Sequence, residues 1–309
     1  MKIFEEGFKQ LGVRFFLIGL LPSAFLATVV AAVIDPPLVL KWLSGLGTGD
    51  AQWSLPSTIL SGAVLITILL GSVQLPMIRL LEGYWPEFFP INWIMNRRAD
   101  RYREKLENLK KERDISDPDD AAALRRAQKA AFAVIQLYPA DPLRIMPTRL
   151  GNILRAGEDA VYRRYGLDAT VVWPRLYPLL SSETRNLVSD QRMQLDLTIR
   201  LTYIFAAAAL VAVIGLFQHS LWWALGVILL IALSFIAYRV SQSSALSYVT
   251  LFQTAFDLHR HALYETMRIE VASDLDEERR QNLILSRFLR EGTGNLKFAP
   301  PQKDEKDEG

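Results

Sequence analysis

Long apolar runs alternate with long polar stretches along this chain. Four runs approach the roughly 20 apolar residues that cross the hydrocarbon core of a bilayer, and they occupy residues 15–34, 57–78, 201–217 and 221–238. None of the four contains Asp, Glu, Lys or Arg, which argues against a proton relay or a charged ion pathway inside a membrane. The pattern therefore predicts a membrane protein with four transmembrane helices.

The polar stretches predict helices of the extramembrane kind. Thr148 precedes an apolar stripe of helical period and can cap its first turn, and Gly166 stands where a left-handed residue ends a helix. The fourth run continues through residues 239–267 without a helix breaker, which predicts one long helix. A shorter helix is expected at 277–290. The expected fold class is an all-α membrane protein, with two transmembrane hairpins, a mostly helical cytoplasmic domain between them and a long C-terminal cytoplasmic helix.

Three polar segments are predicted in less detail. Residues 98–114 carry charge on every face, which suits a solvated helix or a coiled-coil arm. Residues 121–137 are alanine-rich and helical in period, after a start signal at Asp117, Pro118, Asp119 and Asp120; the expected apolar stripe includes Leu124 and Ile135. Residues 168–178 are β-branched, aromatic and bounded by prolines, so a strand, an extended edge and a membrane-skimming loop all stay open.

Basic residues give the expected orientation, because they concentrate on the cytoplasmic side of membrane proteins. Of 35 Lys and Arg residues, only Lys41 falls between the first and second runs. This places both termini in the cytoplasm. The expected organisation is a cytoplasmic N-terminus (1–14), a first span (15–34), an extracytoplasmic loop (35–56), a second span (57–78), a cytoplasmic domain (79–200) with an interfacial segment (79–96), a third span (201–217), a tight turn (218–220), a fourth span (221–238), cytoplasmic helices (239–291) and a disordered tail (292–309).

A signal peptide is the competing interpretation of the N-terminus. The first apolar run is longer than the usual core of a signal peptide, and Glu5 and Glu6 stand in its flank. We therefore expect the first span to be retained, although the charge pattern does not decide whether it is cleaved.

Composition removes several classes of chemistry. The net charge is only +2, so bulk binding of nucleic acid is not expected. The chain has no cysteine, which excludes disulfides, thiolate metal sites and cysteine nucleophiles, and it has three histidines. No catalytic residue and no cofactor are expected.

Two of the apolar runs carry small or polar residues on one face. In the first run these residues repeat every fourth position, which lets helices approach closely in lipid; they are Gly19, Ser23, Ala27 and Ala31. Packing within one subunit and a subunit interface both stay open. In the second run the polar face includes Ser61, Thr67, Gly71 and Gln74, and it suits either helix packing or the lining of an oligomeric pore.

Aromatic residues follow the second run. Trp85, Phe88, Phe89 and Trp93 are suited to headgroup depth, with Arg97 and Arg98 within reach of lipid phosphates. We expect this segment to lie on the membrane surface.

The strongest candidate for a binding site combines basic and aromatic residues between positions 149 and 175. Guanidinium groups bind phosphate and aromatic rings stack on bases, so the set suits a small anionic ligand; it comprises Arg149, Arg155, Arg163, Arg164, Arg175, Tyr162, Tyr165 and Trp173. The alternative is that these side chains hold the domain together and contact lipid headgroups.

Acidic residues offer weaker candidates. Asp257, His261 and Glu265 stand four residues apart on the predicted long helix, as either a weak metal or pH-sensing site or a solvated ion-pair face. Glu158 and Asp159 point about 100° apart on a helix, so they do not share a proton. We expect Asp159 to pair with Arg163.

Four short blocks resemble a group of bacterial four-span membrane proteins. They are LEGYW at 81–85, PTRLGNILRAGED at 147–159, RYGLDATVVWPRLYP at 164–178 and FDLHRHAL at 256–263. The resemblance covers most of the chain after the second run. It implies a multi-pass protein of the bacterial plasma (inner) membrane, and it supplies no catalytic residue.

These patterns favour an oligomeric membrane effector or channel-like protein whose cytoplasmic domain senses a partner or ligand and rearranges the spans. The alternative is a membrane scaffold that docks a cytosolic partner enzyme on its helical arms. A membrane enzyme ranks last. The expected partners are the lipid bilayer, further copies of the chain, and either a cytosolic protein or a small anionic ligand.

Overall fold

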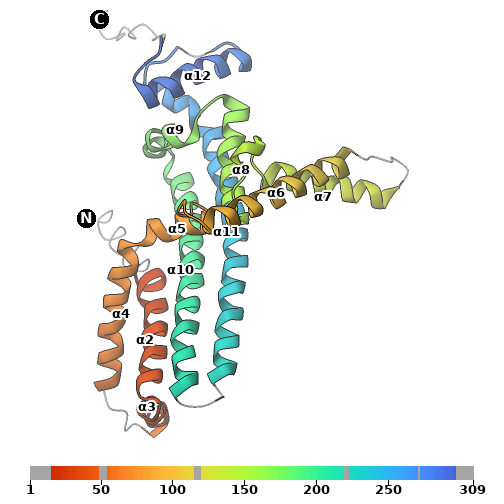
Figure 1. Ribbon diagram of the computed structural model, residues 1–309. Coiled ribbons are helices and arrows are strands. Elements are labelled where there is room, and N and C mark those ends of the chain that lie inside the picture. Colours follow the sequence, from red (N-terminus) through yellow and green to blue (C-terminus); the bar gives the residue numbers. More distant parts are fainter. Residues whose placement is uncertain are drawn as a thin grey trace, which may run out of the picture. The chain divides into compact units, whose positions relative to one another are not determined.

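The computed structural model describes residues 15–48, 54–114, 120–218, 221, 223–270 and 272–296, and Figure 1 shows their arrangement. Within these ranges the regular structure is helical and no strand is present, so the all-α class is confirmed. The chain divides into two compact units. Unit 1 holds residues 1–85 and 192–244, and unit 2 holds residues 86–191 and 245–309.

Unit 1 contains the apolar helices. They are a π-helical turn η1 (Phe15–Leu20), α2 (Leu21–Ile34), α3 (Pro36–Thr48), α4 (Ser54–Ser72), α5 (Gln74–Glu82) and parts of α10 (Ser182–Gln218) and α11 (Trp223–Thr266). Among the described residues, three helices are long and apolar enough to cross a membrane, namely α4, α10 and α11, and a shorter apolar helix covers Ile18–Ile34. These lengths support a multi-pass membrane protein.

The expected loop at 35–56 is partly helical. Asp35 ends α2 as predicted, with its backbone N–H bonded to Ala31 O. However, α3 begins at Pro36, because proline fits the first turn of a helix, where its missing N–H costs no hydrogen bond. Residues 49–53 lie outside the described ranges, as do 219 and 220 of the expected tight turn.

The small-residue face of α2 packs on α4 of the same chain. Gly19, Ser23 and Ala27 are buried, and Ala31 is half-buried. A Cβ atom at Gly19 would lie 2.7 Å from Thr67 Cγ2, and one at Gly62 would lie 3.7 Å from Ala27 Cβ. Packing within one subunit therefore accounts for this face.

A polar cluster in unit 1 surrounds the break between α4 and α5. The helix is interrupted at Val73, three residues before Pro76, because proline offers no N–H to the preceding turn. Arg200 of α10 donates from Nη1 to Ile18 O (3.0 Å) and from Nη2 to Gln74 Oε1 (2.9 Å). The Tyr203 hydroxyl donates to Met77 O (2.8 Å). Helix α10 thus bonds to α5 directly after the break.

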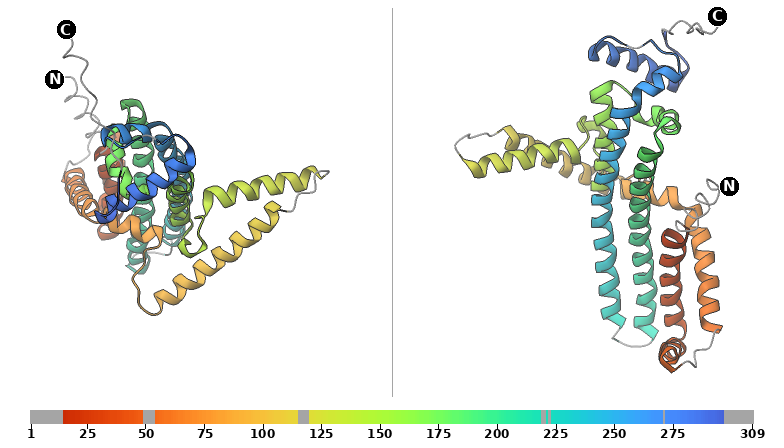
Figure 2. Two further views of the ribbon diagram at one scale, coloured as in Figure 1. Left: turned by 90° about the horizontal axis from the view of Figure 1, so that it is seen from above. Right: turned by 180° about the vertical axis from the view of Figure 1, so that it is seen from behind.

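Unit 2 holds the polar helices. They are α6 (Ile91–Asp114), α7 (Ala121–Leu137), the 3-10 turn η2 (Pro142–Arg144), α8 (Arg149–Tyr165), α9 (Ala169–Leu176), the 3-10 turn η3 (Tyr177–Leu179), α12 (Leu275–Glu291) and the remaining parts of α10 and α11. Helices α6 and α7 form a hairpin, which we call the arm, and it extends away from α8 (Figures 1 and 2). Residues 98–114 are helical, as both predictions for this segment required.

Helix α8 begins and ends as predicted. The Thr148 hydroxyl accepts a hydrogen bond from Gly151 N (3.1 Å), and Gly166 is left-handed with φ 71°. Gly157, in the middle of the helix, lies against Val249 of α11. The predicted continuation of the fourth run is confirmed, since α11 is 44 residues long. The predicted helix at 277–290 is also confirmed as α12.

Residues 169–176 form a helix, so none of the three interpretations of this segment was right. Asp168 caps α9 by accepting from Thr170 N (3.0 Å), although Pro174 lies inside the helix. Val172 and Leu176 are completely buried. Trp173 packs on Phe252 and Phe256 of α11, with ring centroids 4.6 and 5.8 Å away. Tertiary burial therefore overrides the strand preference of the β-branched residues.

Candidate partner-binding site

The predicted basic and aromatic cluster is built into the framework of unit 2. Arg164 Nη1 lies 3.2 Å from Asp257 Oδ2, and the Tyr165 hydroxyl donates to Asp257 Oδ1 (2.7 Å). The guanidinium carbon of Arg260 lies 4.3 Å from the centre of the Tyr165 ring. Burial raises the pKa of the Tyr165 phenol, and its bond to Asp257 adds to the rise. These residues join α8 to α11.

The other side chains of the cluster lie in different environments. Trp173 belongs to the aromatic core, and Arg175 donates to Val171 O (2.6 Å) on its own helix. Arg163 and Tyr162 are exposed, whereas Arg149 and Arg155 are half-buried. Four of the eight side chains therefore have partners within unit 2, which favours the structural alternative over an anionic-ligand site.

The carboxylates of α8 pair with a residue that the sequence did not suggest. Asp159 is buried and accepts hydrogen bonds from Arg144 and from Ala140 N (3.0 Å), so the expected pair with Arg163 is wrong. Arg144 also lies 3.4 Å from Glu158 Oε2. Arg144 sits in a 3-10 turn between two helices, where no helical spacing relates it to Asp159.

The weak metal candidate is not assembled. Asp257 forms an ion pair with Arg164 and accepts a hydrogen bond from Tyr165. His261 packs edge-on against Tyr264, with ring centroids 5.6 Å apart. Within the part of the chain that the structure describes, no group of three or more His, Asp or Glu side chains could hold a metal ion. The ion-pair interpretation of this face is the better one for Asp257.

The polar face of α4 is divided between two environments. Thr67 is buried against α2, and Gln74, just past the break, accepts a hydrogen bond from Arg200. Ser61 and Gly71 are exposed, and the Ser61 hydroxyl donates back to Ser57 O (2.9 Å). The exposed part remains a candidate for contacts outside this chain.

The aromatic residues that follow α5 are largely exposed. Phe88, Phe89 and Trp93 present 54%, 84% and 55% of their surfaces. Trp85 is half-buried, and its indole N–H donates to Leu80 O (2.8 Å). Their exposure agrees with the predicted interfacial role, which stays a prediction.

The arm carries an exposed apolar surface that is flanked by charge. Helix α7 packs its alanine side on α6, with Ala123, Ala127 and Ala130 buried. This reverses part of the predicted stripe, because Leu124 and Ile135 are exposed. Small side chains allow close approach of the two helices, so the larger apolar side chains are left on the outer face.

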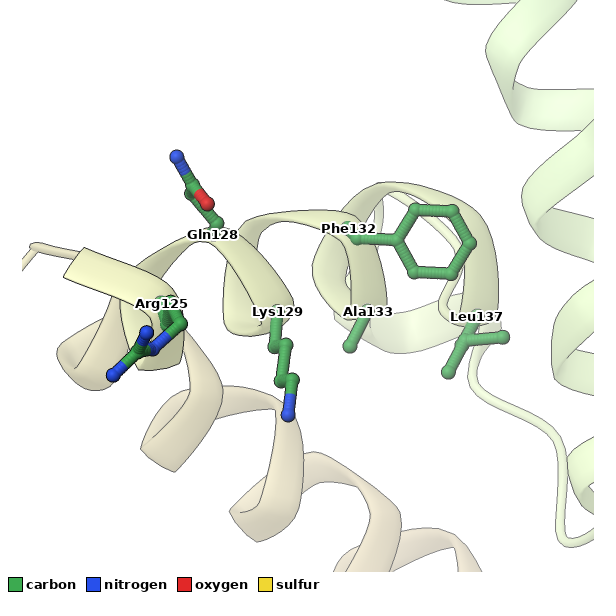
Figure 3. Close-up of a pocket in the computed structure, with 6 residues that line it drawn as sticks. All are labelled: Arg125, Gln128, Lys129, Phe132, Ala133 and Leu137. Atoms are coloured by element: carbon green, nitrogen blue, oxygen red, sulfur yellow. The ribbon is translucent and has the colours of Figure 1, made fainter. Parts of the chain in front are cut away.

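A shallow cavity lies on α7, with a volume of about 440 Å³. It is lined by Arg125, Gln128, Lys129, Phe132, Ala133 and Leu137. In the close-up of Figure 3, Arg125 and Lys129 extend to the same side as Ala133 and Leu137. The Phe132 ring, 54% exposed, stands to one side of them. An apolar floor is thus bordered by two cations.

The charged residues within α7 are all basic. Helix α7 carries Arg125, Arg126 and Lys129, and no acidic residue occurs in residues 121–137. The arrangement can bind an apolar side chain and neutralise neighbouring negative charge. No family model, no curated protein and no solved structure matches this chain.

Proposed function

We propose that this chain is a membrane scaffold that docks a partner protein on the outer face of α7. One observation carries the proposal, namely that the exposed ring of Phe132 and the side chain of Leu137 share a cavity on α7 with Arg125 and Lys129. Large apolar side chains bordered by charge mark sites of protein association. The function is non-catalytic, and it needs no cofactor.

The partner best suited to this face is an acidic amphipathic helix. Such a helix lays its apolar residues in a groove and repeats its anchors every three or four residues. The cavity runs along α7, because four of its lining residues stand four positions apart, namely Arg125, Lys129, Ala133 and Leu137. Acidic side chains of the partner would meet Arg125 and Lys129, and complementary charge fixes the register and speeds association.

We place this docking face in the bacterial cytoplasm. The proposed topology has four spans, with η1 and α2 as the first, α4 as the second, and the apolar parts of α10 and α11 as the third and fourth. The distribution of Lys and Arg supports it, because Arg79, Arg200 and Arg239 flank three of these spans on the same side.

Photo-crosslinking in the native cells tests the docking site. A photoreactive residue in place of Phe132 is expected to form an adduct with one protein that contains an acidic amphipathic helix. The double substitution Arg125→Glu and Lys129→Glu should lower the adduct yield at least about tenfold, because like charges would then meet across the interface. Leu187 of α10 is exposed and provides a control position for the same photoreactive residue.

The matched charge control is the double substitution Arg101→Glu and Lys105→Glu on α6, which has the same spacing and the same change in charge. It should leave the adduct at Phe132 intact. Equal labelling from Leu187, an adduct with the chain itself, or an adduct insensitive to Arg125→Glu and Lys129→Glu would each reject docking on α7.

A second candidate function is an oligomeric, channel-like effector, and the exposed hydroxyl face of α4 favours it. Ser61 and Ser72 are exposed and donate to carbonyl groups of their own helix, at 2.9 and 3.1 Å. In a symmetric assembly this face, with Gly71, could line a pore.

Flux through liposomes that contain the purified protein tests the channel. The expected result is leakage of small ions that Ser61→Leu reduces several-fold, because an apolar constriction dewets a pore. Liposomes that stay tight would count against the channel and would leave the scaffold proposal intact.

A further inference from the structure

One side of α6 carries an aromatic residue followed by three basic residues at a regular spacing. Trp93, Arg97, Arg101 and Lys105 stand four residues apart, so they occupy one stripe of the helix. The Arg97 guanidinium lies 5.1 Å from the centre of the Trp93 ring. All four side chains are exposed, and the exposed ring of Phe89 lies just before the helix. The stripe therefore joins an aromatic end to a basic end.

A cavity of about 380 Å³ lies at the basic end, lined by Arg98, Arg101, Tyr102 and Lys105. Among the described residues, no carboxylate contributes to this lining. Three acidic residues lie on the same part of α6. Asp100 bonds to Arg103 (2.6 Å), Glu107 bonds to Lys110 (2.9 Å), and Glu104 is exposed and does not line the cavity. The lining is therefore strongly cationic, with one phenol.

Two of the four lining side chains are held in place by the chain that follows the arm. Arg98 donates from Nε to Pro147 O (3.1 Å), which fixes the plane of its guanidinium. The Tyr102 ring packs against buried Tyr138, with centroids 6.3 Å apart. A fixed guanidinium loses less freedom on binding, so part of the site is already organised for an anion.

We propose that this cavity binds the phosphate of an anionic lipid headgroup, with Phe88, Phe89 and Trp93 at the adjacent membrane interface. Guanidinium groups bind phosphate oxygens through paired N–H donors, and a phenol adds a further donor. Helix α6 follows the candidate span α4 in the chain after only α5 and residues 83–90. Exposed aromatics beside basic residues suit an anionic membrane surface.

This site differs from the docking face of α7 in its residues and in its ligand. A small soluble phosphate would satisfy the cations but would leave the exposed aromatic residues without a role. An anionic lipid satisfies both, because its headgroup is next to the interface where Phe and Trp side chains are stable. For this reason we assign the site to lipid rather than to free phosphate.

Native mass spectrometry of the full-length protein in neutral detergent tests the proposal. The probes are phosphatidylglycerol, phosphatidylcholine and inorganic phosphate. We expect one phosphatidylglycerol to bind at least tenfold more tightly than phosphatidylcholine. Arg101→Gln with Lys105→Gln should weaken its binding by about 30-fold, because each basic residue at an anionic surface contributes about 1 kcal/mol.

The matched control is Arg125→Gln with Lys129→Gln on α7, which removes the same charge at the same spacing. It should change phosphatidylglycerol binding less than twofold. Equal losses in the two double variants would show a general charge effect and overturn the site. Equal binding of phosphatidylcholine, or displacement of phosphatidylglycerol by low millimolar phosphate, would overturn its assignment to an anionic lipid.

Discussion

Replacing Gly157 with valine is expected to lower the free energy of unfolding of unit 2 by about 3 kcal/mol, the upper end of the usual cost of overpacking. A Cβ atom at Gly157 would lie 2.5 and 2.9 Å from the two Cγ atoms of Val249. Real side chains essentially never approach so closely. The contact is between α8 and α11, so the substitution would force the two helices apart.

Val249 cannot move aside at low cost. It is 2% exposed, and a β-branched side chain in a helix has one strongly preferred rotamer. Replacing glycine inside a helix gains at most about 1 kcal/mol in helix propensity, which is smaller than the expected strain. Thermal unfolding of the full chain in detergent, followed by near-UV circular dichroism, measures the loss.

A double-mutant cycle gives the control. Val249→Ala removes both Cγ atoms, so Gly157→Val should cost clearly less in that background, with a coupling of about 1–3 kcal/mol. If Gly157→Val costs the same with and without Val249, the contact does not determine the packing of α8 on α11.

Asn152→Asp is the second substitution with a large expected effect. At neutral pH it should lower the free energy of unfolding by about 3 kcal/mol, because it leaves a backbone carbonyl unpaired and buries a charge. Asn152 is completely buried. Its Oδ1 accepts from Met146 N (2.8 Å) and its Nδ2 donates to Met146 O (2.9 Å). A carboxylate keeps the first bond but places negative charge against the carbonyl oxygen.

The pH dependence gives this prediction its sign. Burial disfavours the charged form, so the pKa of the introduced carboxyl in the folded state rises above its unfolded value. The protonated carboxyl can donate to Met146 O, so the variant is most stable below the unfolded pKa, and its deficit grows as pH rises through the folded pKa. Unfolding measured at pH 5 and pH 8 should therefore show a smaller deficit at pH 5.

Asn186→Asp provides the comparison, because Asn186 is exposed on α10. This substitution should change the free energy of unfolding by no more than about 0.5 kcal/mol at either pH. The proposed role of the Asn152 amide would be contradicted if Asn152→Asp caused an equally small loss of unfolding free energy, or a loss that grew toward low pH.

The local signals in the sequence were sufficient where a helix end depends on residues within one turn. Thr148 and Gly166 were identified correctly as the ends of α8, and Asp120 accepts from Ala122 N (2.7 Å) at the start of α7. Caps and breakers act over three or four positions, so they can be read without knowledge of the fold.

The candidate site was only partly predictable. The sequence indicated a solvated helix or a coiled-coil arm at residues 98–114, and it marked the aromatic residues near Trp93. It did not show which side of α7 would be left exposed, because alanine and the larger apolar residues both fit the helical period. Nor did it show the basic cavity of α6, whose Arg98 and Tyr102 are placed by contacts with Pro147 and Tyr138.

The sequence by itself determined the three apolar helices of the described chain that are long enough to cross a membrane, the helical class, and the ends of helices with local caps. Only the tertiary structure decided that Ala169–Leu176 is a helix, that Asp159 pairs with Arg144, and that Tyr165 bonds to Asp257, 92 residues away. The physical reason is the range of the interactions. Hydrophobic period and capping act within a few residues, whereas burial and ion pairing depend on which distant helices meet.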